Sequence, residues 1–249
     1  MTQDKIRKLA NRQLAPYRYG NGRVLWFDDC EHTAIHMQQN TGGAGTVAIS
    51  TAMAWAGDKS YYLEATLDAD SVMLRKRIPR PVNEGYIGLD FYFAITDDDY
   101  NNFSTINFGI MSYNKSLYYD SKIYMAASGL ASGLALTYLD DTGAYPGLPF
   151  SFPLNADNDS MYYFHHCKLV IDTIINQYYY MMLDNKFFDL RGKRIYAQAA
   201  TASDYIFVTI ELVGKTAGAA TGIYVDQITI TDQEELSPYP EQYLKETEM

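Results

Sequence analysis

The stretch HHCKLVIDTIINQYYYMMLDNKFFDLRGKRIY, residues 165–196, separates two readings of this chain, a sheet protein and an enzyme with a histidine site. β-Branched, aliphatic and tyrosine residues fill two runs that meet at a turn near residues 173–176. A second turn falls at Asp184-Asn185, residue types that tolerate a left-handed backbone. Because successive strand side chains point to opposite faces, His165 and His166 cannot share one site. The stretch therefore predicts antiparallel strands with hydrogen-bonded histidines.

The whole chain has a sheet-forming composition. It contains 249 residues, 47% of them hydrophobic, which is enough to bury one sizeable core. Its 23 tyrosines are the unusual number, and aromatic residues suit pleated, half-buried surfaces. Tyrosine also keeps a polar group for a contact at the surface.

Strand-like runs separated by turn residues follow one another along most of the sequence. Residues 4–14 have the spacing of a short helix that ends before Pro16. The remainder predicts ten to twelve strands and no strong internal helix, which is typical of an all-β, two-sheet antiparallel jelly-roll sandwich. We expect a basic N-terminal arm at 1–23, the sandwich at 24–231 and an extended acidic C-terminal tail at 232–249.

The charge is negative overall and unevenly spread. A net charge of −10 argues against nucleic acid as the partner. Residues 1–23 carry a net charge of +5 and residues 232–249 a net charge of −5, while residues 74–85 form a second basic segment with two prolines. These segments are either solvated ends and an exposed or edge-blocking arm, or contacts that dock onto acidic copies of the chain in a homo-oligomer or larger assembly. The expected assembly contacts are Lys5, Arg7, Lys8, Arg12, Arg75, Lys76, Arg77 and Arg80.

The cysteine and hydropathy patterns indicate neither a cysteine metal site nor a membrane segment. Cys30 and Cys167 form no metal-binding motif and lie beside apolar runs, which predicts buried free thiols. The sequence shows neither an apolar signal segment nor a membrane-spanning run, so we expect no membrane partner and a cytoplasmic or virion location.

Several strand-and-turn patterns resemble a known group of folds. "LVID" followed by "YYYMMLDNKFFDL" resembles the meander of concanavalin A-like and laminin-G-like sandwiches. "LWFDDCEH", "YYLEATLD" and "GIYVDQITIT" resemble the first and last strands of jelly-roll carbohydrate-binding modules. The resemblance covers residues 24–231 and implies a sandwich with a glycan-binding role. It also implies a structural Ca²⁺ held by Asp28, Asp29 or Glu31 together with Asp226.

Glycan binding would use aromatic rings as stacking platforms. Trp55 lies near a turn, and four tyrosines are further candidates: Tyr118, Tyr119, Tyr178 and Tyr180. The alternative is that these rings fill the core.

Motifs for catalysis are missing. The E-x-D-x-x-E run of laminarinase-like glycosidases does not occur, nor does G-x-S-x-G. "TGGAGT" at 41–46 lacks the Lys-Ser/Thr of a phosphate loop, and we expect it to be a flexible connection. We therefore expect no enzyme but a lectin-like module that docks to glycans or to an acidic protein surface. The alternatives are a structural component of an assembly, such as a bacteriophage capsid decoration or virion surface protein, and a glycoside hydrolase with no assignable residues.

Overall fold

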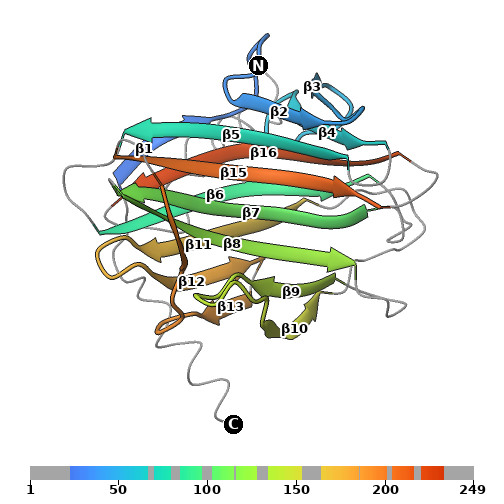
Figure 1. The fold of residues 1–249 in the computed structure, drawn as a ribbon. Coiled ribbons are helices and arrows are strands. Elements are labelled where there is room, and N and C mark those ends of the chain that lie inside the picture. Colours follow the sequence, from blue (N-terminus) through green and yellow to red (C-terminus); the bar gives the residue numbers. More distant parts are fainter. Residues whose placement is uncertain are drawn as a thin grey trace.

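The computed structural model describes ten segments, which together contain sixteen strands in two stacked antiparallel sheets (Figure 1). The described residues are 23–66, 70–79, 85–96, 103–114, 116–127, 134–152, 164–184, 186–200, 204–215 and 220–232. The predicted arm at 1–22, the tail after Asp232, and the assembly contacts Lys5, Arg7, Lys8, Arg12 and Arg80 lie outside them. No helix in the described part of the chain is long and apolar enough to cross a membrane.

One layer, here called the β6 sheet, has β6 and β16 at its centre. Its order is β13 (Lys186–Asp189), β12 (Gln177–Leu183), β11 (His165–Asp172), β6 (Tyr86–Ile95), β16 (Thr221–Asp232), β4 (Ser60–Ala65) and β3 (Thr46–Ser50). On one side, the first half of β16 pairs with β4 and its second half pairs with β1 (Arg23–Asp28). The change of partner coincides with a bulge in β16 between Asp226 and Thr229.

The other layer, the β7 sheet, has β7 and β15 at its centre. Its order is β10 (Gly147–Phe152), β9 (Leu134–Tyr138), β8 (Leu117–Ala127), β7 (Phe103–Asn114), β15 (Tyr205–Gly214), β5 (Ser71–Pro79) and β2 (Gln38–Gly42), with β14 (Tyr196–Ala199) paired to β8. In each sheet a late strand lies between two early ones. The predicted two-sheet antiparallel jelly-roll sandwich is confirmed.

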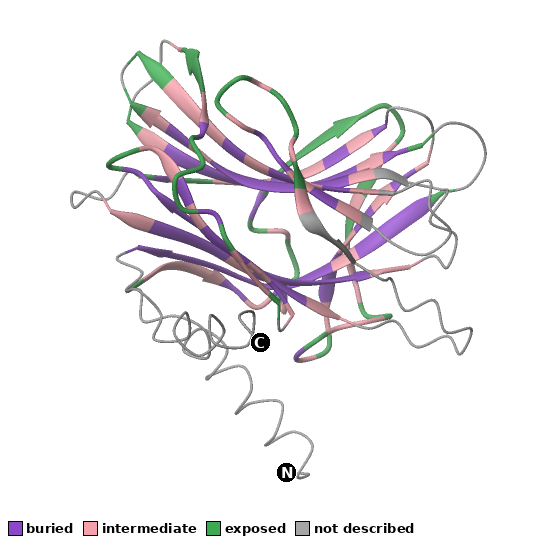
Figure 2. Ribbon diagram, turned by 90° about the horizontal axis from the view of Figure 1, so that it is seen from below, coloured by how far each residue is buried: buried purple, intermediate pink, exposed green. Residues whose placement is uncertain are grey.

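Period-two alternation places the core between the sheets. Along β15, Ile206, Val208, Ile210 and Leu212 are fully buried, and Figure 2 shows buried residues lining the space between the layers. Phe91 of β6 meets Phe108 of β7 edge-on, with ring centroids 5.3 Å apart. Each fully buried side chain of this size contributes roughly 1.5–3 kcal/mol. Cys30 and Cys167 are buried free thiols, as predicted.

Both sheets bend in the same direction. In Figure 2 the β7 sheet is the upper layer, and its outer face is concave. The outward-pointing residues of β5, β15, β7 and β8 therefore line the inside of a curve. A ligand lying along that surface would meet side chains from several strands at once.

Two sequence expectations needed correction. The basic segment was expected to be an exposed or edge-blocking arm, but residues 71–79 form β5, which is hydrogen bonded to β15 on one side and β2 on the other. Residues 41–46 were expected to be a flexible connection, and instead complete β2, turn at Gly43 with φ of 73° and start β3. The expected turns are present, since Asn176 and Asp184 both have φ of 53°.

Candidate functional site

Two loops at one end of the sandwich are fastened to each other. The β1–β2 loop spans 29–37 and the β3–β4 loop spans 51–59. Glu31 Oε1 accepts the backbone N–H of Asp58 at 2.6 Å and of Lys59 at 2.9 Å. In return, Lys59 Nζ donates to the carbonyls of Glu31 at 3.1 Å and His32 at 3.2 Å.

Asp226 fixes the second loop to the sheet. Its carboxylate, buried at the β16 bulge, accepts the backbone N–H of Trp55 at 2.8 Å, Ala56 at 3.0 Å and Gln227 at 2.7 Å. Burial raises the pKa of Asp226 to about 7, with a further rise from the charge of Glu31, and the three N–H donors oppose both effects. Gln227 has φ of 48°, the left-handed backbone of the bulge.

Trp55 is held on the outer face of the β6 sheet. Its ring stacks on Tyr92, with centroids 4.7 Å apart and planes 11° from parallel, and the residue is 41% exposed. Trp55, one of the predicted ligand contacts, therefore has an accessible ring that packs on Tyr92.

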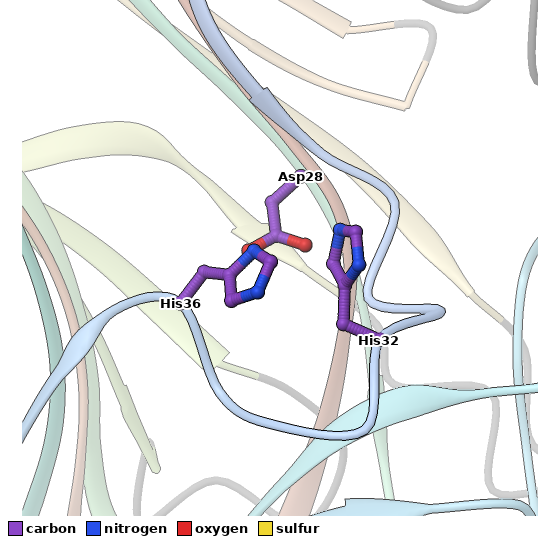
Figure 3. A group of neighbouring side chains, drawn as sticks. All are labelled: Asp28, His32 and His36. Carbon is purple, nitrogen blue, oxygen red and sulfur yellow. The ribbon is translucent and has the colours of Figure 1, made fainter.

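Asp28 gathers two histidines around a buried carboxylate (Figure 3). Asp28 is 1% exposed and accepts the N–H of Cys30 at 2.8 Å and the hydroxyl of Tyr61 at 2.7 Å. The imidazoles of His32 and His36 stack at 3.9 Å, and one ligand atom from each of the three residues lies within 4.8 Å of the others.

The oxygen-only calcium set expected from the sequence is not assembled. Among the residues that the structure describes, Asp28, His32 and His36 are the only three ligand-bearing side chains that come together in this way. Glu31 and Asp226 instead accept backbone N–H groups.

The concave face carries a row of aromatic rings. Tyr118 of β8, Tyr113 of β7 and Tyr205 of β15 are direct cross-strand neighbours, here called the tyrosine row. Their rings stack, with centroids 5.3 Å apart for Tyr113 and Tyr118 and 4.4 Å for Tyr113 and Tyr205.

Cations from β5 extend this row. The guanidinium of Arg75 lies 3.3 Å from the ring centre of Phe207, and that of Arg77 lies 4.2 Å from Tyr205. Lys76, on the other face of β5, has its ammonium 4.4 Å from the ring centre of Trp26. Arg75, Lys76 and Arg77 were expected to make assembly contacts. In the structure the cationic group of each one packs on an aromatic ring of its own chain.

A polar cluster lies farther along the same face of the β7 sheet, where Glu211 is six residues from Tyr205 on β15. Glu211 accepts hydrogen bonds from Ser71 Oγ at 2.5 Å and Asn107 Nδ2 at 3.1 Å, and forms an ion pair with Lys122 at 3.2 Å. Burial acts to raise the pKa of Glu211, but these three partners outweigh it and the pKa is lowered. The pKa of Asp120 is raised, because burial and the charge of Glu211 outweigh the effect of Lys122.

The other residues predicted to contact a ligand differ in how far their side chains are buried. Tyr119 is partly buried and packs against the core. Tyr178 and Tyr180 are 1% and 2% exposed, and the Tyr178 hydroxyl donates to the carbonyl of Leu139 at 2.8 Å. Neither buried ring can stack on a ligand without opening the sheet. Of the five predicted residues, Trp55 and Tyr118 reach the surface best.

The adjacent histidines contact different carboxylates. His165 Nδ1 lies 2.9 Å from Asp184 Oδ2, and His166 Nε2 lies 2.9 Å from Asp90 Oδ1. This agrees with the prediction of separate, hydrogen-bonded histidines.

Sequence reasoning missed Tyr113, Tyr205, His32 and His36. The tyrosines are outward positions of strands whose neighbours were not known, so only their alternation with buried residues offered a signal. The histidines follow Asp28 in the pattern D-x₃-H-x₃-H, but nothing in that spacing reports a loop that folds back on Tyr61.

Comparison with known proteins supports the fold. No family model matches this sequence, and no curated protein matches it. The structure resembles an endo-β-1,4-glucuronan lyase from Trichoderma reesei, with 10% identity, a TM-score of 0.50, and coverage of 84% of this chain and 95% of that one. It also resembles the botulinum neurotoxin serotype D binding domain, with 11% identity, a TM-score of 0.50, and coverage of 92% and 52%.

Several of these neighbours are much longer than this chain, which spans 46% of the botulinum neurotoxin DC binding domain at 11% identity and a TM-score of 0.48. At such identities the likeness concerns the fold. The chain has the two-sheet antiparallel sandwich that its strand patterns predicted.

Proposed function

We propose that this domain is a non-catalytic binding module that holds glycans on the concave face of the β7 sheet. The observation that carries the proposal is the tyrosine row. Outward positions of a sheet that faces water are normally polar, yet Tyr113, Tyr118 and Tyr205 place three stacked rings there. Clustered aromatic surface outside the core is typical of interaction sites.

The chemistry of the row suits sugars. Stacked rings present their edges and hydroxyl groups outward, which supplies hydrogen-bonding groups on a rigid apolar base. Arg75 and Arg77 add guanidinium donors, which bind sugar hydroxyls and, in pairs of parallel bonds, carboxylates. Arg75 Nε is buried and has no hydrogen-bond partner within the described part of the chain. A carboxylate-bearing sugar or an acidic protein surface would match these groups.

The polar cluster supports binding without turnover. Glu211 is engaged by Ser71, Asn107 and Lys122, which suits a carboxylate that holds neighbouring side chains in place. A glycosidase needs a paired acid and a base or nucleophile that both reach the sugar. Two of the fold neighbours are named as an endo-β-1,4-glucuronan lyase and a botulinum neurotoxin binding domain, so the fold itself decides neither way.

A glycan array with matched variants tests the proposal. We expect the wild-type chain to bind a subset of glycans, and Tyr113→Ala and Tyr205→Ala each to weaken that binding by about tenfold, the loss of roughly one stacking or hydrogen-bonding contact. Tyr224→Ala is the matched control, because Tyr224 lies on the outer face of the opposite sheet, where its ring is tilted against that of Tyr62 with centroids 5.0 Å apart. Trp55→Ala tests the other accessible ring.

Each alternative outcome is distinct. Binding that is lost in Trp55→Ala but kept in both tyrosine-row variants would move the site to the β6 sheet. Absence of any glycan signal at high protein concentration would reject glycan binding. Cleavage of a polysaccharide that disappears in Asp120→Asn or Glu211→Gln would reject the non-catalytic assignment.

A further inference from the structure

We infer that Asp28, His32 and His36 form a binding site for a divalent transition-metal ion of the zinc class. Two imidazole nitrogens and one carboxylate oxygen are ligands that Zn²⁺ prefers, whereas Ca²⁺ takes six to eight oxygens. Asp28 ends β1, His32 and His36 lie in the β1–β2 loop that follows, and one ligand atom of each lies within 4.8 Å of the others (Figure 3). This site is independent of the tyrosine row and of the glycan-binding proposal.

The carboxylate is already oriented for a metal. Asp28 is buried, and its two oxygens accept one hydrogen bond each, from Cys30 N–H and from the Tyr61 hydroxyl. A carboxylate oxygen has a further lone pair after accepting one bond. Hydrogen-bonded, fixed carboxylates are the usual surroundings of a metal ligand, because the outer partners set its direction.

The loop that carries the histidines is held at several points. The Tyr61 hydroxyl that donates to Asp28 also accepts the backbone N–H of His36 at 3.1 Å. Lys59 Nζ binds the carbonyl of His32 at 3.2 Å, and Lys76 Nζ binds that of His36 at 3.4 Å. Tyr61 is thus a positioning residue that links the carboxylate to the backbone of one imidazole ligand.

The spacing requires only side-chain adjustment. Ligand atoms at about 2.0–2.1 Å from one tetrahedral zinc lie roughly 3.3–3.5 Å from each other. The three atoms lie within 4.8 Å of one another, and His32 and His36 are exposed, so rotation of their imidazoles closes the difference. The solvent side remains open for water or an exogenous ligand, which is the arrangement of three-ligand zinc sites.

The test uses Zn²⁺ and Co²⁺ added to the metal-stripped full-length chain. We expect calorimetry to give one Zn²⁺ per chain, and Co²⁺ to give the intense visible bands of a four-coordinate ion. His32→Ala and His36→Ala should each weaken zinc binding by at least about tenfold, and Tyr61→Phe by about 10- to 100-fold, as for an outer-shell partner. Zinc should raise the Tm of the wild type but not of the double variant His32→Ala/His36→Ala.

His165→Ala is the matched control, because the chain has only four histidines and His165 is engaged by Asp184. Its zinc affinity should equal that of the wild type. Unchanged binding in the double variant, loss of binding in His165→Ala alone, or displacement of Zn²⁺ by an equal concentration of Ca²⁺ would each overturn the inference. The exposed histidine variants leave buried Asp28 in place, so circular dichroism should confirm that they remain folded.

Discussion

Asp226 links the bulge in β16 to the loop that carries Trp55. At the scale of single residues, its carboxylate makes the stability of the fold depend on pH. The carboxylate is fully buried, and burial raises its pKa to about 7 from 3.8. A raised pKa means that the folded chain holds the proton more tightly than the unfolded chain. The resulting stabilisation is fully present below about pH 4 and is lost as the pH rises through about 7.

The isosteric variant Asp226→Asn tests this sign. Between about pH 5 and about pH 8 the wild-type free energy of unfolding should fall by on the order of 2 kcal/mol more than that of the variant. Urea unfolding at both pH values measures the difference. Asp189→Asn is the control, since Asp189 is part of an exposed ion pair with Arg191 and such pairs contribute little. Parallel pH profiles for wild type and Asp226→Asn would contradict the assignment.

Lys122 neutralises Glu211 on the concave face. Lys122→Met leaves a buried carboxylate with one partner fewer and should destabilise the fold by about 1–3 kcal/mol at neutral pH. Because the pKa of Glu211 is lowered in the fold, the stabilisation is present above about pH 4.5 and fades as the pH falls. The loss should therefore shrink on acidification. Lys186→Met, on an exposed residue of β13, should have little effect, and equal losses in the two variants would disprove the pairing.

At the scale of strands, Gly109 of β7 leaves no room for a side chain against β8. It lies between Lys122 of β8 and Thr209 of β15, and a methyl group there would come within 2.2 Å of the Ser121 carbonyl oxygen. Because that neighbour is backbone, Gly109→Ala should cost about 2 kcal/mol or more. Gly85→Ala is the control, with no atom within 4 Å of the added carbon. Denaturant midpoints should separate the two variants, and a neutral Gly109→Ala would refute the contact.

Local pattern was enough to predict many strands but not their neighbours. Period-two alternation placed His165 and His166 on opposite faces of β11, and Asp184 indicated a turn, because these features depend on adjacent residues. The pairing of β5 with β15 joins residues more than a hundred positions apart, so the basic segment was interpreted as an arm. Short β2 and β14 have exposed, polar sequences with weak strand signals.

The candidate sites show the same limit. Trp55 was predictable as an aromatic residue near a turn. The tyrosine row needs the register of β8, β7 and β15, and the metal site needs Tyr61 of β4 to approach the β1–β2 loop. Asp226 is a case where a predicted role was not found. The resemblance implied that it binds a metal, but at the bulge in β16 its carboxylate accepts backbone N–H groups.

At the scale of the whole molecule, the two oppositely charged terminal segments join the sandwich at neighbouring residues. Arg23 and Asp232 are register partners at the ends of β1 and β16, and their side chains form two hydrogen bonds of 3.0 and 2.5 Å. Residues 1–23 carry +5 and residues 232–249 carry −5. Adjacent attachment points give pairing within one chain a high effective concentration, with which pairing between copies must compete.

Complementary truncations separate these two kinds of pairing. A chain of residues 23–249 keeps the acidic segment, and a chain of residues 1–232 keeps the basic one, so neither can satisfy its charges internally. We expect their mixture to form a one-to-one complex at low salt, detected by light scattering, that dissociates at high salt because screening weakens exposed ion pairs. The chain 23–232, which lacks both segments, should stay monomeric throughout. If the mixture remains two monomers at low salt, the terminal charges do not drive assembly, and association of this acidic domain would have to use another surface.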